Sequence, residues 1–259
     1  MIGSAKKTLM SLIRAEVETL APEEGFLSDL KSTVSKLNPE SRPSSNYRPS
    51  GMNCLRQMYY DKVKAPMDAI VNDYSGVRIP ETGTASHEKI QYYVSKMKDC
   101  GYDCEWIDVA QYVMEQNLDY LIIKDKKAFE TKLYDTRYGI SFLCDGIIKY
   151  KGKYYILEIK TEAEMKGAER KGADEKHIAQ ASCYSLCLKI DQIMWLYEER
   201  NFCIPKCYLT TITPEMRSEI ILKIETVDNA VKTGEVPEKT SLTKTCYYCV
   251  YKNFCRKQG

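Results

Sequence analysis

The stretch that most constrains the fold lies near the middle of the chain, at Cys144–Thr161, and its pattern predicts a β-hairpin. Its first half, Asp145–Tyr150, is mainly apolar after a polar start, and its second half, Lys153–Lys160, is rich in aromatic and β-branched residues. Lys151–Gly152 between them is typical of a tight turn, because glycine adopts positive φ without strain. We therefore expect the sheet to be organised around this hairpin.

The charged residues of this hairpin are expected to gather at one place. Because successive side chains of a strand point to opposite faces, Glu158 and Lys160 share one face and Ile159 lies on the other. Asp145 begins the paired strand, so it can lie beside them. A buried carboxylate needs a partner, and two acids with a lysine suit a hard divalent cation such as Mg²⁺ or Mn²⁺. The alternative is a surface hairpin whose acids form salt bridges with Lys160.

Helical and strand patterns surround the hairpin. Helices are predicted over Ala5–Leu20, Ser28–Leu37, Cys54–Lys64, Thr82–Met97, Trp106–Leu118, Lys176–Leu188 and Thr213–Lys232. Strands are predicted over Ala128–Tyr134, Gly139–Tyr150, Lys153–Thr161, Gln192–Glu198 and Cys207–Thr211. Trp106–Leu118 is also compatible with a strand, although we favour a helix. Thr213 is the expected N-cap of the last helix and Gly234 its stop.

The segment Asn38–Met52 contains prolines, serines and arginines and is expected to be an extended loop. Arg42 and Arg48 within it are candidate phosphate contacts, and a solvated loop is the alternative.

Polar residues outside the hairpin are candidates to complete a site. His87, one of two histidines, follows a run of small residues on a predicted helix; a structural or surface histidine is the alternative. Gln180 and Tyr184 are four residues apart and share one helix face. Glu130 lies on the first predicted strand, where a solvated carboxylate is expected; the family resemblance given below implies an accessory role at the metal site instead. His177 is interpreted as a surface residue.

Four cysteines form the most specific pattern. Cys246, Cys249 and Cys255 follow a C-x₂-C-x₅-C spacing, and Cys54 is the candidate fourth ligand. Four thiolates bind either a structural Zn²⁺ or an iron–sulfur cluster. The flanking basic and aromatic residues are expected either to contact phosphates and bases or to pack around the bound group: Arg56, Tyr59, Tyr60, Tyr247, Tyr248, Tyr251, Lys252, Arg256 and Lys257.

Taken in chain order, these residues resemble the PD-(D/E)XK nucleases. Asp145 with Glu158–Lys160 resembles the core motif of that superfamily. His87 resembles the N-terminal histidine motif of its RecB-type members, and the glutamine–tyrosine pair resembles their fourth motif. One N-terminal cysteine with a C-terminal triad resembles the Cas-four-like and AddB-type iron–sulfur exonucleases, some of them phage-borne. The resemblance covers about Cys54–Cys255.

The resemblance implies a mixed α/β (α+β) fold with an αβββαβ core. Residues 1–53 are then an N-terminal helical extension and loop. Residues 54–259 are a nuclease domain closed by the four cysteines around a [4Fe–4S] cluster, with structural Zn²⁺ as the alternative.

The resemblance also implies a metal-dependent exonuclease. His87, Asp145, Glu158 and the Ile159 carbonyl would hold Mn²⁺ or Mg²⁺. Lys160 would orient or deprotonate the attacking water, and Gln180 with Tyr184 would position the strand. The implied substrate is single-stranded DNA ends, in phage recombination or replication or in CRISPR-type DNA processing. Cleavage polarity stays open, as does assembly into a homo-oligomer or with partner recombination proteins. A non-cleaving DNA-binding subunit of a larger complex is the alternative.

Composition limits the other function classes. The net charge of +2 over 259 residues means that nucleic-acid binding must come from local patches and not from bulk charge. The sequence has no apolar run long enough for a transmembrane helix and no recognisable signal peptide, so a cytoplasmic location is expected. Eleven cysteines in such a location favour metal ligation or core packing over disulfides.

Overall fold

The computed structural model describes residues 21–38, 44–68, 73–163, 172–241, 243–247 and 249–258. The helix predicted over Ala5–Leu20, together with Arg42 and Tyr248, lies outside these ranges. The chain divides into two compact units. All candidate site residues belong to the larger unit, which contains the described residues of 44–68 and 81–258.

The smaller unit contains helix α2 (Pro22–Leu37) and the start of helix α4 (Tyr74–Ser95), up to Pro80. α2 confirms the helix predicted over Ser28–Leu37. It begins earlier than predicted, at a proline followed by two acids, which suit a helix N-terminus.

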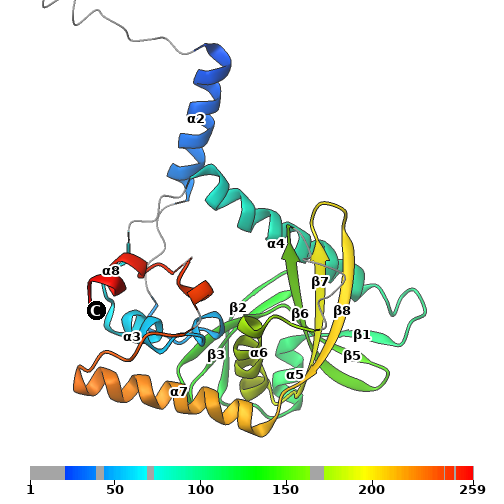
Figure 1. Cartoon of the computed structure of the whole chain (residues 1–259). Helices are drawn as coiled ribbons and strands as arrows, with labels where there is room; N and C mark the ends of the chain where they lie inside the picture. The colour runs from blue at the N-terminus through cyan, green and yellow to red at the C-terminus, as the bar shows by residue number, and fades with distance from the viewer. Residues whose placement is uncertain are drawn as a thin grey trace, which may run out of the picture. The chain divides into compact units, whose positions relative to one another are not determined.

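A five-stranded sheet forms the centre of the larger unit (Figure 1). Its order is β1 (Cys104–Ile107), β5 (Gly146–Tyr150), β6 (Lys153–Glu162), β7 (Gln192–Glu199) and β8 (Ile204–Thr211). β6 and β7 are parallel and are connected through helix α6 (Glu175–Leu188), because parallel neighbours need a crossover. The other neighbouring pairs are antiparallel.

A second sheet has three antiparallel strands, β2 (Leu121–Lys127), β3 (Glu130–Asp135) and β4 (Ile140–Cys144). β4 ends at Cys144 and β5 begins at Gly146, so the chain passes from one sheet to the other at Asp145. The single strand predicted over Gly139–Tyr150 is therefore wrong, because this stretch pairs in two different sheets. β2 was missed by the sequence patterns.

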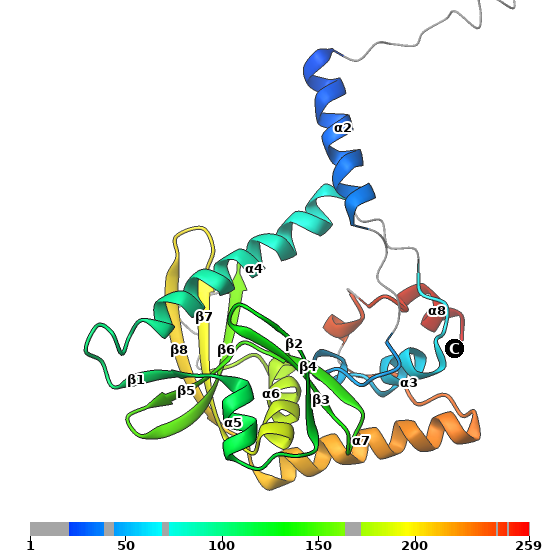
Figure 2. The same ribbon diagram turned by 180° about the vertical axis from the view of Figure 1, so that it is seen from behind.

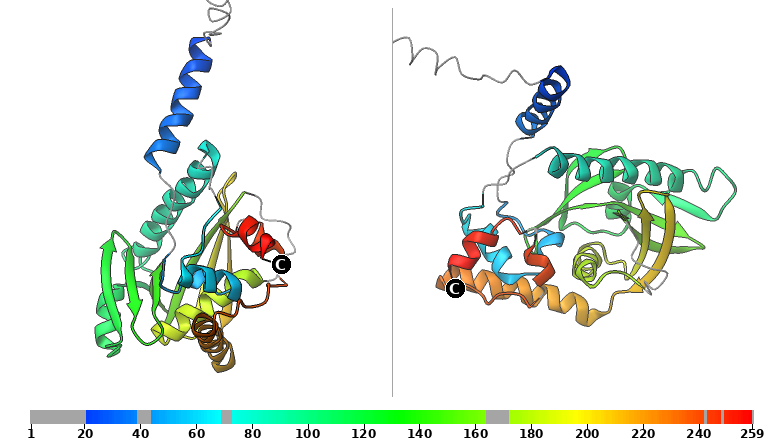
Figure 3. Two further views of the ribbon diagram at one scale, coloured as in Figure 1. Left: turned by 90° about the vertical axis from the view of Figure 1, so that its left-hand side faces the viewer. Right: turned by 45° about the horizontal axis from the view of Figure 1, so that its top comes forward.

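The helices enclose the five-stranded sheet from both sides (Figures 2 and 3). Buried residues of α6 pack with Ile156, Ile193 and Trp195 on one face, whereas Ile90 of α4 packs with Leu157 and Ile159 on the other. The remaining helices of the larger unit are η1 (Pro49–Gly51), α3 (Leu55–Val63), α5 (Val109–Glu115), α7 (Pro214–Thr233), η2 (Thr243–Cys246) and α8 (Lys252–Lys257).

The predicted fold class is confirmed as mixed α/β, and the central hairpin is confirmed with its turn. Lys151 and Gly152 both have positive φ, of 48° and 77°. α7 begins after the N-cap Thr213 and stops at Gly234, which is left-handed at φ 76°. The helix predicted over Trp106–Leu118 is wrong in its first part, because residues there pair with β5 as strand β1 before α5 begins.

The C-terminal segment is fixed to α3 by a buried hydrogen-bond network. The Tyr251 hydroxyl donates to Asp61 Oδ1 at 2.8 Å, and Arg48 Nη2 donates to Asp61 Oδ2 at 2.9 Å. The Tyr60 ring lies 5.4 Å from that of Tyr251 and 5.1 Å from that of Phe254. This packing holds the C-terminal cysteines against the start of α3, the helix that Cys54 caps.

Tyr251→Phe should lower the free energy of unfolding by about 1–3 kcal/mol, because it leaves one oxygen of the buried Asp61 carboxylate without its donor. Urea denaturation measures this loss. Tyr102→Phe is the control, since Tyr102 is 64% exposed. Equal losses for the two variants would contradict the role given to this hydrogen bond.

Candidate active site

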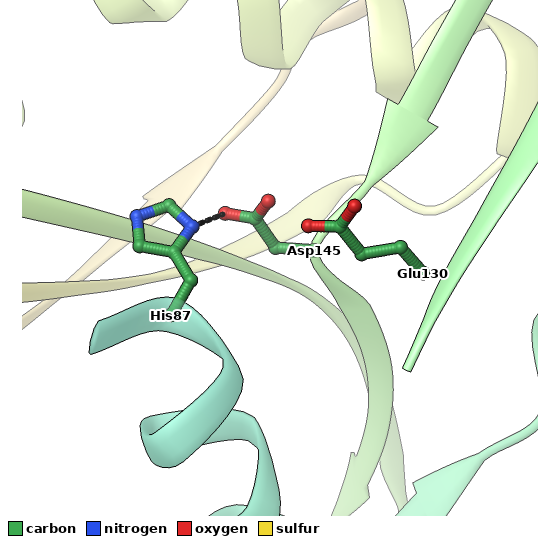
Figure 4. Close-up of side chains that lie close together, drawn as sticks. All are labelled: His87, Glu130 and Asp145. Atoms are coloured by element: carbon green, nitrogen blue, oxygen red, sulfur yellow. Dashed lines mark ion pairs between the residues drawn. The ribbon is translucent and has the colours of Figure 1, made fainter. Parts of the chain in front are cut away.

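Three ligand-type side chains from different parts of the fold meet at the junction of the two sheets. His87 comes from α4, Glu130 from the start of β3, and Asp145 from between β4 and β5 (Figure 4). One ligand atom of each lies within 4.8 Å of the others, and His87 Nδ1 is 3.8 Å from Asp145 Oδ2. A nitrogen and two carboxylates at this spacing could hold a divalent metal ion.

Asp145 is held by main-chain and side-chain contacts. The Ile159 N–H donates to its Oδ2 at 2.8 Å, and Gln91 Nε2 donates to its backbone carbonyl at 2.7 Å. Any larger residue in place of Gly146 would force the Trp106 ring to shift, because a Cβ there would lie 2.4 Å from that ring. These contacts therefore fix both the bend between the two sheets and the position of the Asp145 carboxylate.

Glu158 places a third carboxylate near the site, on the α6 side of β6. It is 1% exposed, its Oε1 accepts a hydrogen bond from Lys160 Nζ, and its Oε2 is buried with no hydrogen-bond partner among the described residues. Burial, and after it the charge of Asp145, raise the pKa of Glu158 to about 7, although Lys160 and His87 oppose the rise. This oxygen is suited to a cation, since no donor in the described part of the chain satisfies it.

Lys160 is held in its charged form by the same acids. Burial lowers its pKa, but the charges of Glu158 and Asp145 outweigh burial, and the pKa lies above its ordinary value. The prediction that Glu158 and Lys160 share a face is confirmed by their contact.

Gln180 and Tyr184 lie one turn apart on α6, as their spacing predicts. Gln180 Nε2 donates to the Tyr184 hydroxyl at 2.8 Å. Tyr184 is buried, and its pKa is raised by burial and then by the charges of Glu158 and Asp145. This pair therefore lies beside the two acids.

The four cysteines predicted as ligands line one cavity of about 320 Å³: Cys54, Cys246, Cys249 and Cys255. All four are free thiols. Burial raises the pKa of Cys249, and the other three thiols raise it further because they lie close by. Arg56 Nη1 lies 3.8 Å from the Cys255 sulfur. The donor set of this cavity suits a group with four thiolate ligands.

The aromatic residues beside these cysteines were expected either to stack on bases or to pack around the bound group, and the structure separates them. Tyr59, Tyr60 and Tyr251 are buried and pack in the core, so stacking of these three rings on bases is excluded by the structure. Tyr247 is 67% exposed.

Two polar residues differ from what the sequence suggested. Gln91 was missed, although it follows His87 by one helix turn and is fully buried; that spacing is the only signal for it. His177 was interpreted as a surface residue, but its ring lies 6.2 Å from Trp195 and its Nδ1 is 2.9 Å from the Tyr197 hydroxyl.

No protein-family model and no curated protein matches the chain. Among solved structures it is similar to SSO0001, with a TM-score of 0.45 and 13% identity over 91% of this chain and 96% of that chain. It is also similar to two structures of the alkaline exonuclease LHK-Exo from Laribacter hongkongensis, one of them in complex with dAMP, each with a TM-score of 0.44 and 10% identity over 84% of this chain and 96% of that chain. Similarity at this level carries no information about the chemistry of the site.

Gln91→Leu should weaken Mn²⁺ binding about tenfold, because it keeps the side-chain volume but removes the donor that ties α4 to the Asp145 carbonyl. Titration calorimetry with Mn²⁺ measures the change. Gln116→Leu, at an exposed position outside the site, is the control and should leave affinity unchanged. Wild-type affinity in Gln91→Leu would contradict the positioning role.

Proposed function

We propose that this chain is a divalent-metal-dependent deoxyribonuclease. The observation that carries the proposal is the buried Glu158 Oε2, which no described residue satisfies, beside the group of His87, Glu130 and Asp145. A carboxylate oxygen buried without a donor is costly, and a bound cation offsets that cost. The proposed ligands are His87, Asp145, Glu158 and the Ile159 carbonyl, with Glu130 as an accessory acid.

The chain's own residues have distinct roles in this proposal. A bound Mg²⁺ or Mn²⁺ would acidify an attacking water and stabilise negative charge on the phosphate. Lys160, fixed by its contact with Glu158, would orient that water and offset the developing charge. Tyr184, whose hydroxyl is fixed by Gln180, would position the sugar–phosphate backbone.

The proposed substrate is single-stranded DNA, degraded from an end. The motif order Asp145, Glu158–Lys160 and Gln180–Tyr184 supports this, since it resembles that of RecB-type exonucleases. The same resemblance supports a setting in phage recombination or replication, or in CRISPR-type DNA processing.

For the cysteine cavity we propose a structural [4Fe–4S] cluster. The four thiols converge from both ends of the larger unit, Cys54 before α3 and the other three after α7. A bound cluster would join these ends. Structural Zn²⁺ is the competing occupant, because it takes the same ligands.

Glu158→Gln should reduce cleavage of single-stranded DNA at least ~100-fold, because a metal ligand contributes several kcal/mol to the transition state. The variant keeps the side-chain shape and an acceptor for Lys160. Oligonucleotides labelled separately at each end, incubated with Mn²⁺, Mg²⁺ or EDTA, give both the rate and the direction of cleavage.

Glu235→Gln, at an exposed position after α7, is the matched control and should cleave at the wild-type rate. Metal-independent cleavage, or full activity in Glu158→Gln, would refute the mechanism. DNA binding without any cleavage would favour the alternative of a non-catalytic subunit.

Anaerobically purified protein should be brown and contain iron and sulfide, because a [4Fe–4S] cluster absorbs visible light. Elemental analysis and the absorption spectrum test this. Cys249→Ser should lose colour and iron, whereas Cys100→Ser, an exposed cysteine outside the cavity, should keep both. If the protein is colourless and contains one zinc ion, the iron–sulfur assignment is wrong and the four cysteines bind structural Zn²⁺.

A further inference from the structure

A second cavity, of about 340 Å³, lies between the segment 44–50 and strands β3 and β4. Its lining combines apolar surface from Pro49, Phe142 and Leu143 with several polar side chains. It includes the hydroxyls of Ser50 and Ser141, the cations Arg48 and Lys132, and the pair Gln180 and Tyr184. We call this cavity the β3–β4 groove.

The wall of the groove is built by backbone pairing. The Tyr47 N–H donates to the Gly139 carbonyl at 2.9 Å, and the Ser141 N–H donates to the Tyr47 carbonyl at 2.8 Å. These bonds fix the segment that carries Arg48 and Ser50 along the edge of β4. The groove is therefore a preformed feature of the larger unit.

The positive charge of the groove depends mostly on one side chain. Arg48 forms an ion pair with Asp61 at 2.9 Å, so its charge is largely offset. Lys132 is exposed on β3 and lines the groove. Of the two cations that line the groove, Lys132 is therefore the one without an ion pair among the described residues.

Tyr184 links the groove to the candidate metal site. It lines the groove together with Gln180, and its hydroxyl senses the charges of Glu158 and Asp145. Glu130 and Lys132 are two residues apart on β3, so they share one face and are separated by about 6.6 Å along the strand. That separation is comparable to the distance between successive phosphates of an extended nucleic-acid strand.

We propose that the β3–β4 groove binds the phosphate next to the scissile one on a single DNA strand, with Lys132 as its cation. The serine hydroxyls would donate to the phosphate oxygens, and a volume of about 340 Å³ suits part of one strand and is too small to enclose a duplex. This inference rests on the proposed nuclease function and names a subsite for its substrate.

The test is equilibrium binding of a fluorescent oligothymidine of about 12 nucleotides, in EDTA and over a series of KCl concentrations. Lys132→Ala should lower affinity several-fold at low salt. It should also reduce the slope of log K against log[salt] by about 0.7, the loss of one phosphate contact to a single strand. A duplex of matched sequence should bind wild type more weakly, and its slope should not change in Lys132→Ala.

Lys232→Ala is the charge-matched control, since Lys232 is exposed on α7 and does not line the groove. Equal salt slopes for wild type and Lys132→Ala would overturn the proposal. An equal loss of affinity in Lys232→Ala, or an equal loss of duplex affinity in Lys132→Ala, would also overturn it. So would the absence of any binding by the wild type. Because EDTA prevents metal-dependent cleavage, this result is independent of catalysis. If the salt slope depends on Lys132 but the protein does not cleave DNA, the proposed nuclease function is wrong and the proposed binding of a single strand in the groove still holds.

Discussion

The arrangement of the candidate site depends on the close approach of two carboxylates, Asp145 and Glu158, of which the second is almost completely buried. Burial of Glu158, and after it repulsion from the charge of Asp145, raise the pKa of Glu158, and this rise records the cost of the arrangement. Lys160 and the Ile159 N–H offset part of it. One carboxylate oxygen remains unsatisfied by the described residues, and this makes a cation the most economical explanation of the geometry.

The fold holds this unfavourable arrangement in place by joining two sheets at one residue. Asp145 cannot move without disturbing β4, β5 or the close contact between Gly146 and Trp106. α4 adds His87 and ties itself to the same residue through Gln91. The site is therefore positioned by regular elements and their packing, which suits a site that must hold a ligand with fixed geometry.

The cysteine cavity and the β3–β4 groove share a structural support. Arg48 lines the groove and donates to Asp61, which in turn accepts from Tyr251 in the C-terminal segment. If the segment around the cysteines became disordered, Asp61 would lose its hydrogen bond from Tyr251, and Arg48 in the groove would be held less firmly by Asp61. In this way a group bound by the four thiols would stabilise the surface proposed for DNA, although it lies outside the candidate active site.

The sequence by itself determined the local features: the hairpin with its turn at Lys151–Gly152, the shared face of Glu158 and Lys160, and the Gln180–Tyr184 pair. These depend on strand and helix periodicity, which neighbouring residues set. Glu130 was a candidate accessory acid from the family resemblance, and the structure places it with His87 and Asp145. Only the tertiary structure decided that Gly139–Tyr150 divides between two sheets, that residues 104–107 form a strand, and that Gln91 joins the site. Strand pairing and side-chain burial depend on residues far away in the chain, so no local pattern contains them.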